Sequence, residues 1–188
     1  MPTLKIIVAS TRPTRIGRTI GDWAAAHAVS HGGFGVELVD LAEVGLPFLD
    51  EPEDATTGRY VHQHTKDWSA TIDTADAFVF VMPEYNYGFN APLKNALDFL
   101  CREWRHKPVG FVSYGGLSGG LRAVEMIKPV IVKLGMIPAG NAVTVFRRQM
   151  MDGDGRLIVD GNLAASADHM LDELRQLTEA MSVMRARV

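Results

Sequence analysis

The sequence predicts an α/β fold with a doubly wound, five-stranded parallel sheet in the strand order 2-1-3-4-5. Short runs of apolar and β-branched residues alternate along the chain with longer segments of helical periodicity, which is typical of strands joined by crossover helices. Five such units fit within 188 residues, the usual size of one domain. We therefore expect a single domain over residues 1–188, with helices on both faces of the sheet.

The first part of the chain is expected to hold two strands and two helices. Residues 4–9 are nearly all apolar, as in a strand buried on both faces, and residues 17–30 follow as an amphipathic helix. Residues 36–41 form a second, more exposed strand. The segment 46–58 is rich in proline and acidic residues and is expected to be a loop, and 60–75 is the next helix.

The middle of the chain contains the strand with the strongest signal. Residues 77–82 are all apolar, and we expect Pro83 to stop this third strand because proline cannot donate to a strand ladder. A helix over residues 91–101 has Pro92 in its first turn, where the missing N–H costs nothing. Residues 108–113 form the fourth strand.

The last part of the chain is expected to end in a long helix. Residues 119–134 have helical periodicity, and Pro129 should kink this helix or split it in two. The fifth strand is expected at 136–146 and a turn at 152–155. Apolar residues at three-to-four spacing over 163–184 indicate an amphipathic helix.

Composition excludes several classes of protein. A net charge of -3 gives no basic field to hold nucleic acid or an anionic membrane, so neither is expected as a partner. One cysteine, Cys101, excludes an internal disulfide and any site that needs several thiolates. The longest apolar run, 77–82, is far shorter than a membrane span. We expect a cytoplasmic, soluble protein.

Ligands of doubly wound sheets bind beyond the carboxyl ends of the strands, where the winding direction reverses. The segments after the first, third and fourth strands should therefore carry the chemistry. We call them loop one (residues 9–17), loop three (residues 83–90) and loop four (residues 113–120). They are the most unusual segments of the sequence.

Loop one has the features of an anion site. It precedes a helix, whose free N–H groups and dipole attract anions. Hydroxyls of Ser10, Thr11 and Thr14 and the guanidinium groups of Arg12 and Arg15 add donors suited to phosphate oxygens. The loop has neither G-x-G-x-x-G nor a G-x-x-x-x-G-K-[ST] motif, so a monophosphate suits it best. The alternative is a polar helix cap with solvated arginines.

Loop three combines aromatic rings with amides. Tyr85, Tyr87 and Phe89 alternate with Asn86 and Asn90 directly after a strand. Aromatic faces beside amide donors and acceptors suit a flat heteroaromatic ligand, which needs stacking area and hydrogen bonds along its edge. The alternative is an aromatic turn that packs on the end of the sheet.

Loop four is rich in glycine, which lets a backbone approach a ligand closely, and Tyr114 could cover one side of a ring. The same loop matches the G-x-S-x-G elbow of serine hydrolases around Ser118. His169 is the only later histidine, and it follows Asp168 within an expected helix, where adjacent side chains do not face each other. A serine hydrolase that uses Ser118 therefore stays a minor alternative.

Together the three loops resemble the NAD(P)H-dependent FMN reductases of the flavodoxin-like fold, a group that includes quinone, azo-dye and chromate reductases. The resemblance rests on residues 10–12 with Arg15, on the motif P-E-Y-N-x-G-x-x-x-x-L-K-N-A-L-D over residues 83–98, and on residues 113–116. It extends from about residue 4 to residue 146. The middle motif is the most specific of the three.

The resemblance implies an FMN site built from all three loops. The FMN phosphate would be held by the side chains of Ser10, Arg12 and Arg15 and the amides of Ile16 and Gly17. The ring edge would be bound by Pro83, Glu84, Tyr85, Asn86 and Tyr87. The ring would be flanked by Ser113, Tyr114, Gly115 and Gly116.

The resemblance also implies a reaction. Hydride would pass from NADPH or NADH to N5 of FMN, and the electrons would then leave to a quinone, flavin, azo dye or similar small acceptor in a ping-pong scheme. No catalytic side chain and no metal is expected. Family members are commonly oligomers, so a homodimer or homotetramer is expected. The alternative within the same fold is an FMN-binding electron carrier or sensor without NAD(P)H turnover.

Overall fold

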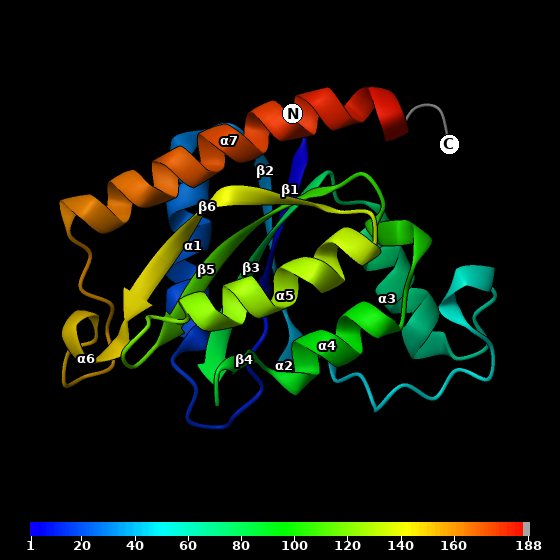
Figure 1. Cartoon of the computed structure of the whole chain (residues 1–188), viewed down its shortest axis with the longest axis horizontal. Coiled ribbons are helices and arrows are strands. Elements are labelled where there is room, and N and C mark those ends of the chain that lie inside the picture. Colours follow the sequence, from blue (N-terminus) through cyan, green and yellow to red (C-terminus); the bar gives the residue numbers. More distant parts are fainter. Residues whose placement is uncertain (186–188) are drawn as a thin grey trace.

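The computed structural model describes residues 1–185 and contains a sheet of five parallel strands in the order β2-β1-β3-β5-β6, with the short β4 paired antiparallel to β3 (Figure 1). This confirms the predicted strand order, because β5 and β6 are the fourth and fifth parallel strands along the chain. The strands are β1 (Thr3–Val8), β2 (Gly35–Asp40), β3 (Ala77–Tyr85), β4 (Gly88–Phe89), β5 (Pro108–Gly115) and β6 (Ile137–Phe146).

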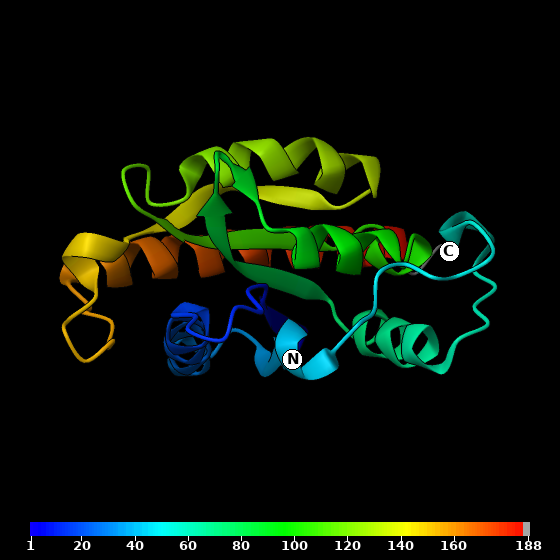
Figure 2. The same cartoon turned by 90° about the horizontal axis from the view of Figure 1, so that it is seen from below.

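Helices cover both faces of the sheet (Figures 1 and 2). The α-helices are α1 (Gly17–His31), α2 (Leu41–Val44), α3 (Gln63–Asp73), α4 (Ala91–Asp98), α5 (Leu121–Lys133), α6 (Arg147–Met150) and α7 (Gly161–Arg185). Two short 3-10 turns, η1 (Ala55–Thr57) and η2 (Arg102–Trp104), lie between them. None of the helices within the described chain has both the length and the apolar character needed to cross a membrane.

The two faces of the sheet carry separate apolar cores. Side chains that alternate along β3 point to opposite faces: Phe78 and Phe80 pack toward α3, α4 and α5, whereas Val79 and Val81 pack toward α1 and α7. In Figure 1, α4 and α5 lie on the near side of the strands and α1 lies on the far side. The winding therefore reverses between β1, which feeds α1, and β3, which feeds α4.

The outer strand β6 carries an irregularity in its register with β5, between the partners of Val109 and Phe111. A carboxylate from α7 occupies this place. Oε1 of Glu173 accepts the backbone N–H of Gly140 at 2.8 Å, and Oε2 accepts the backbone N–H of Asn141 at 3.2 Å. Exposed strand N–H groups at the edge of the sheet are thus satisfied by a side chain.

The expectation that Pro83 stops the third strand is wrong, because β3 continues to Tyr85. The carbonyl of Val81 accepts the N–H of Ala9, so the backbone of Val81 faces β1, and so does that of Pro83 two residues later. β1 ends at Val8, so no partner strand needs a donor at Pro83. The proline lies where its missing N–H is harmless.

Three helix predictions differ in part from the structure. The helix expected over 119–134 begins at Leu121 and is not split at Pro129, which was one of the two outcomes expected there: α5 is one helix, and Pro129 lies on its exposed face, where water can reach the carbonyl it leaves free. The helix expected from residue 60 begins at Gln63, because the Glu51 carboxylate holds the preceding amides of Val61 and His62. The helix expected to reach residue 101 ends at Asp98.

Lys107 is a charged side chain inside the fold. It is 5% exposed, and its Nζ donates to the carbonyls of Ile72 at 2.9 Å and Asp73 at 3.0 Å, at the end of α3. Burial lowers the pKa of Lys107 from 10.5 to about 8, against the opposing attraction of Asp73. The folded chain therefore releases this proton more easily than the unfolded chain.

This pKa shift predicts a pH-dependent stability. Between about pH 8 and pH 10.5 the unfolded state holds the proton that the folded state has lost, so the contribution of Lys107 to the unfolding free energy rises with pH. We expect urea denaturation to show that the unfolding free energy of the wild type rises relative to that of Lys107→Met as the pH increases across this window, by up to about 3 kcal/mol in total. A difference independent of pH would contradict the assignment.

Candidate functional site

Loops one, three and four meet at the carboxyl edge of the sheet around a cavity of about 470 Å³, which we call the central cleft. In Figure 1 the loop after β1 and helix α6 gather at the lower left, where the arrowheads of β3 and β6 point. The cleft is lined by Arg12, Thr14, Arg15, Ile16, Pro83, Glu84, Tyr85, Tyr114, Gly115, Gly116, Arg147 and Arg148. Most of the predicted site residues are among them, whereas Ser10, Gly17, Asn86, Tyr87 and Ser113 do not line the cleft.

Two buried hydroxyls lie at the bottom of loop one. Oγ of Ser10 and the phenol oxygen of Tyr114 are shielded from solvent and lie near each other, and neither has a hydrogen-bond partner among the other groups of residues 1–185. A Cβ built on Gly17 would lie 2.5 Å from each of these oxygens, so only glycine leaves room for both at the start of α1. Burial raises the pKa of Tyr114 more than the neighbouring Ser10 hydroxyl lowers it, which keeps the phenol protonated and able to donate.

The start of α1 is open to a ligand. The residue that precedes the helix, Ile16, has no side chain that could cap it, so the first amides of α1 are left for another acceptor. Together with the two buried hydroxyls they form a set of donors without acceptors. Such a set suits an anion with several oxygens, and a phosphate has that form.

Arg15 does not extend freely into the cleft. Its guanidinium forms two contacts with the Asp40 carboxylate at the end of β2, at 2.6 and 2.7 Å, and also donates to the Ser10 carbonyl at 2.6 Å. Asp40 is buried, so the pair is largely shielded from water. The arginine therefore ties loop one to the neighbouring strand, and Arg12 is the guanidinium of this loop that lacks an ion-pair partner within the described chain.

Loop three is a β-hairpin. β3 and β4 pair antiparallel through Tyr85 and Gly88, and the two residues between them, Asn86 and Tyr87, have φ of 49° and 74°. Positive φ at both central residues is typical of the tightest hairpin turns. Asparagine tolerates this conformation well and tyrosine poorly, so the turn holds Tyr87 at an energetic cost.

Charged groups connect this hairpin to loop four. Oε1 of Glu84 lies 3.0 Å from Nε of Arg122, and Oε2 accepts the hydroxyl of Ser118 at 2.5 Å. The Arg122 guanidinium also lies over the ring of Tyr87, 3.9 Å from its centre. The hydroxyl of Ser118 thus has a carboxylate partner, and no histidine of the described chain is hydrogen-bonded to it. Asp168 pairs instead with His27, at 2.8 Å.

Loops one and three are joined by Asn90, which the sequence interpretation counted among the amides of loop three but did not include among the cofactor-binding residues. Asn90 is buried, and its Nδ2 donates to the Ala9 carbonyl at 2.7 Å. This bond spans the reversal point between β1 and β3. A buried amide four residues after the aromatic turn was the available signal, but its partner lies 81 positions away in sequence.

The glycines of loop four serve mostly the protein itself. The hydroxyl of Ser113 donates to the carbonyl of Gly119 at 3.0 Å, which folds the loop back onto β5. Gly119 and Gly120 have positive φ, and a Cβ on either would collide with nearby residues of the same fold. Gly115 and Gly116 both line the cleft, and of the two only Gly116 has open space where a Cβ would lie.

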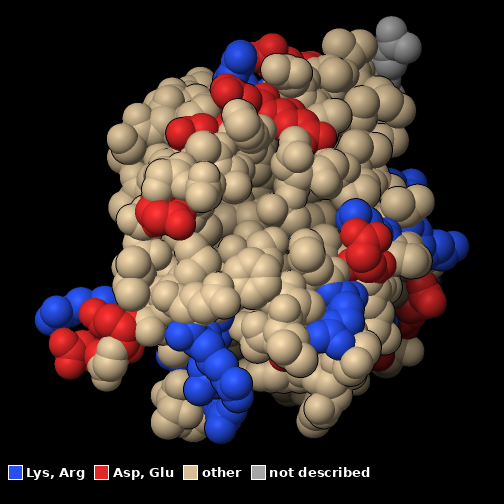
Figure 3. Space-filling view, turned by 60° about the vertical axis from the view of Figure 1, so that its left-hand side comes forward, with Lys and Arg blue, Asp and Glu red and all other residues tan. Residues whose placement is uncertain are grey.

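Two arginines that the sequence interpretation overlooked complete the cleft. Arg147 and Arg148 form the first turn of α6, directly after β6. Figure 3, which brings the left-hand side of Figure 1 forward, shows basic side chains in the lower part of that face below a mostly uncharged surface. The signal available in the sequence was a pair of adjacent arginines at the carboxyl end of a strand.

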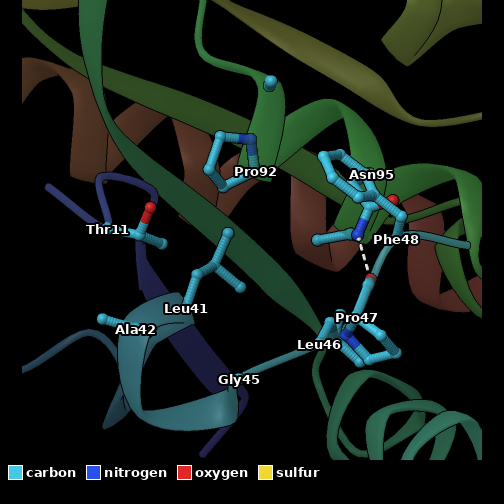
Figure 4. Close-up of a pocket in the computed structure, with 11 residues that line it drawn as sticks. Thr11, Leu41, Ala42, Gly45, Leu46, Pro47, Phe48, Pro92 and Asn95 are labelled. Carbon is cyan, nitrogen blue, oxygen red and sulfur yellow. Dashed lines mark hydrogen bonds between the residues drawn. The ribbon is translucent and has the colours of Figure 1, made fainter.

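A second cavity of about 480 Å³ lies on the other side of loop one (Figure 4). Leu41, Pro47, Phe48 and Pro92 contribute apolar surface, and Nδ2 of Asn95 donates to the Pro47 carbonyl at 2.7 Å. This cavity lacks the arginines and unpartnered hydroxyls of the central cleft. Its lining predicts apolar contacts rather than an anion site.

Comparisons with known proteins identify the family of this chain. The family model described as NADPH-dependent FMN reductase matches residues 2–150. The chain is 39% identical over 156 residues to NAD(P)H-dependent FMN reductase C4B3.06c of Schizosaccharomyces pombe, across 81% of this chain and 78% of that protein. It is 33% identical over 153 residues to probable NADPH:quinone oxidoreductase 1 of Oryza sativa subsp. japonica, across 78% of this chain and 76% of that protein.

A solved structure has the same fold. The flavoenzyme NAD(P)H:(acceptor) oxidoreductase FerB from Paracoccus denitrificans matches with a TM-score of 0.75 and 20% sequence identity. The match covers 96% of this chain and 99% of that chain. At this level of identity the likeness concerns the fold alone.

The contact of Gly17 with two buried oxygens gives a testable prediction. Gly17→Ala would place a methyl group 2.5 Å from Ser10 Oγ and from the Tyr114 hydroxyl, so one of these side chains must move. We expect a loss of about 1–3 kcal/mol in the free energy of unfolding in urea. Gly161→Ala is the matched control, because its Cβ would meet open space at the start of α7, and it should cost nothing. Equal stability of the two variants would contradict the geometry.

Proposed function

Because this chain belongs to the NADPH-dependent FMN reductase family, we propose that it binds FMN in the central cleft, oxidises NADPH or NADH, and transfers the electrons to a small organic acceptor. A quinone is the acceptor class we favour, since a relative with 33% identity is named a probable NADPH:quinone oxidoreductase. The enzyme class follows from the family, whereas the acceptor and the course of the reaction are our proposals.

One observation carries the cofactor proposal. Ser10 and Tyr114 are buried hydroxyls that have no partner in the described chain other than each other, and they lie together beneath the uncapped start of α1, so donors outnumber acceptors there. Unsatisfied buried donors are costly, so the arrangement makes physical sense when an anion supplies the missing acceptors. Arg12 lines the same cleft without a carboxylate partner in the described chain, which adds a positive charge for a phosphate dianion. The residues present therefore fit the phosphate end of FMN.

The remaining residues have distinct roles in this proposal. Ile16 and Gly17 offer amides to the phosphate, and Arg15 holds loop one in shape through Asp40. Tyr85, Gly115 and Gly116 line the cleft beyond the phosphate end and would contact the flat ring.

The hairpin and loop four support these contacts from outside the cleft. Pro83 and Glu84 continue β3 to the hairpin, and the Asn86–Tyr87 turn fixes its tip. Ser113 holds loop four in place from below. When bound, FMN would supply the redox chemistry that no side chain has. The role of the protein would be to orient the reactants and to keep other molecules from contacting the ring.

We also propose that the chain acts as a homodimer or homotetramer. Phe48, which lines the second cavity, is 87% exposed in the single chain, and the next residue, Leu49, is 47% exposed. Association would remove such surface from water. Light scattering of the FMN-loaded protein should give the mass of two or four chains, and Phe48→Glu should lower it; a monomeric wild type would contradict the proposal.

The enzyme proposal is tested by anaerobic stopped-flow reduction. Flavin absorbance near 450 nm of the FMN-loaded protein should bleach when NADPH or NADH is added and return when a quinone follows. No bleaching with either nucleotide would leave only a flavin-binding carrier or sensor.

The phosphate site is tested separately by retention of FMN during dialysis. Arg12→Ala should weaken FMN binding about tenfold or more, because it removes a charge-assisted contact. Arg105→Ala is the matched control: Arg105 is exposed and is also without an ion pair in the described chain, but it does not line the cleft. Equal FMN retention by the two variants would remove Arg12 from the site.

A further inference from the structure

We propose that Arg147 and Arg148 form a second phosphate-binding point at the rim of the central cleft, which recognises the 2′-phosphate of NADPH and makes the enzyme prefer NADPH to NADH. The inference rests on the proposed function and assigns residues to its nucleotide selectivity. NADPH and NADH differ only in this phosphate, so a selective enzyme must read that group.

The distribution of ion pairs supports the proposal. Most arginines of the described chain lie within 4.0 Å of a carboxylate. Four within residues 1–185 do not, and three of these four, Arg12, Arg147 and Arg148, line the same cleft. The fourth, Arg105, lies elsewhere. Unpaired guanidinium groups repel one another, so three in one cleft indicate a ligand that carries several negative charges.

One phosphate does not account for all of this charge. Loop one already provides the FMN phosphate with Arg12, two buried hydroxyls and the start of α1. Arg147 and Arg148 belong to a different element, α6, at the carboxyl end of β6. They therefore supply two further positive charges to a second anion. A phosphate monoester is the best match, because the planar guanidinium group can donate two parallel hydrogen bonds to it.

The two arginines are held on a fixed segment rather than on a loose loop. The carbonyl of Arg147 accepts the N–H of Met151 at 3.2 Å, and Met151 pairs in turn with Leu157 across the following turn. The N–H of Ile158 donates to the Met150 carbonyl at 2.8 Å. Both side chains are exposed on this base and line the cleft.

The first experiment compares steady-state kinetics with the two nucleotides and an uncharged quinone. The double variant Arg147→Ala/Arg148→Ala should lower kcat/KM for NADPH at least about tenfold and that for NADH far less, so the preference falls by about the same factor. Arg105→Ala should leave the preference unchanged. Single Arg→Gln variants keep the test informative if the double variant folds poorly, and each should give part of the shift.

The second experiment needs no turnover. Calorimetric titration with adenosine 2′,5′-bisphosphate should give binding that weakens about tenfold in the double variant, whereas binding of 5′-AMP should be the same in both proteins. Equal losses with NADPH and NADH, or a loss of bound FMN, would overturn the proposal, because the arginines would then serve a group shared by both reactions. If neither NADPH nor NADH reduces the flavin of the wild type, the enzyme proposal fails. The titration with adenosine 2′,5′-bisphosphate then still decides whether the arginines bind a 2′-phosphate.

Discussion

The site depends on the reversal of winding between two neighbouring parallel strands. β1 continues into α1 on one face of the sheet, and β3 continues into α4 on the other face. The two connecting loops must therefore diverge, and the space between them cannot be filled by the backbone of either. Every group assigned to cofactor binding lies around this gap. The fold thus provides a place for a ligand before any side chain specifies which ligand enters.

Polar bonds between side chains and backbone keep that gap in one shape. Asn90 connects loop three to the end of β1, Ser113 connects loop four to β5, and Arg15 connects loop one to β2 through Asp40. None of these three residues needs to touch the cofactor in order to matter. They hold the loops in one conformation, so binding of the cofactor has to order little of the loop backbone and loses little conformational entropy.

The sequence predicted what depends on local periodicity and missed what depends on distant partners. The alternation of five strands with helices was sufficient to predict the fold and the strand order, and the position of three segments after the first, third and fourth parallel strands was sufficient to predict the loops that form the cleft. The role of Arg15 could not be derived in the same way, because its partner Asp40 is 25 positions away and on another strand. The continuation of β3 through Pro83 likewise depends on where β1 ends. Arg147 and Arg148 were overlooked because they follow the last strand, away from the motifs, and only the folded chain brings them to the cleft.

The contact of Glu173 with the bulged part of β6 has a consequence for the behaviour of the protein at high concentration. An open sheet edge with free N–H groups is a template on which another molecule can add its own strand, and repeated addition leads to fibrils. Here the carboxylate occupies the N–H groups of Gly140 and Asn141 and places negative charge beside them. Strand addition at this position would have to displace and desolvate that charge. Glu173 on α7 should therefore oppose the addition of a further strand at the bulged part of β6.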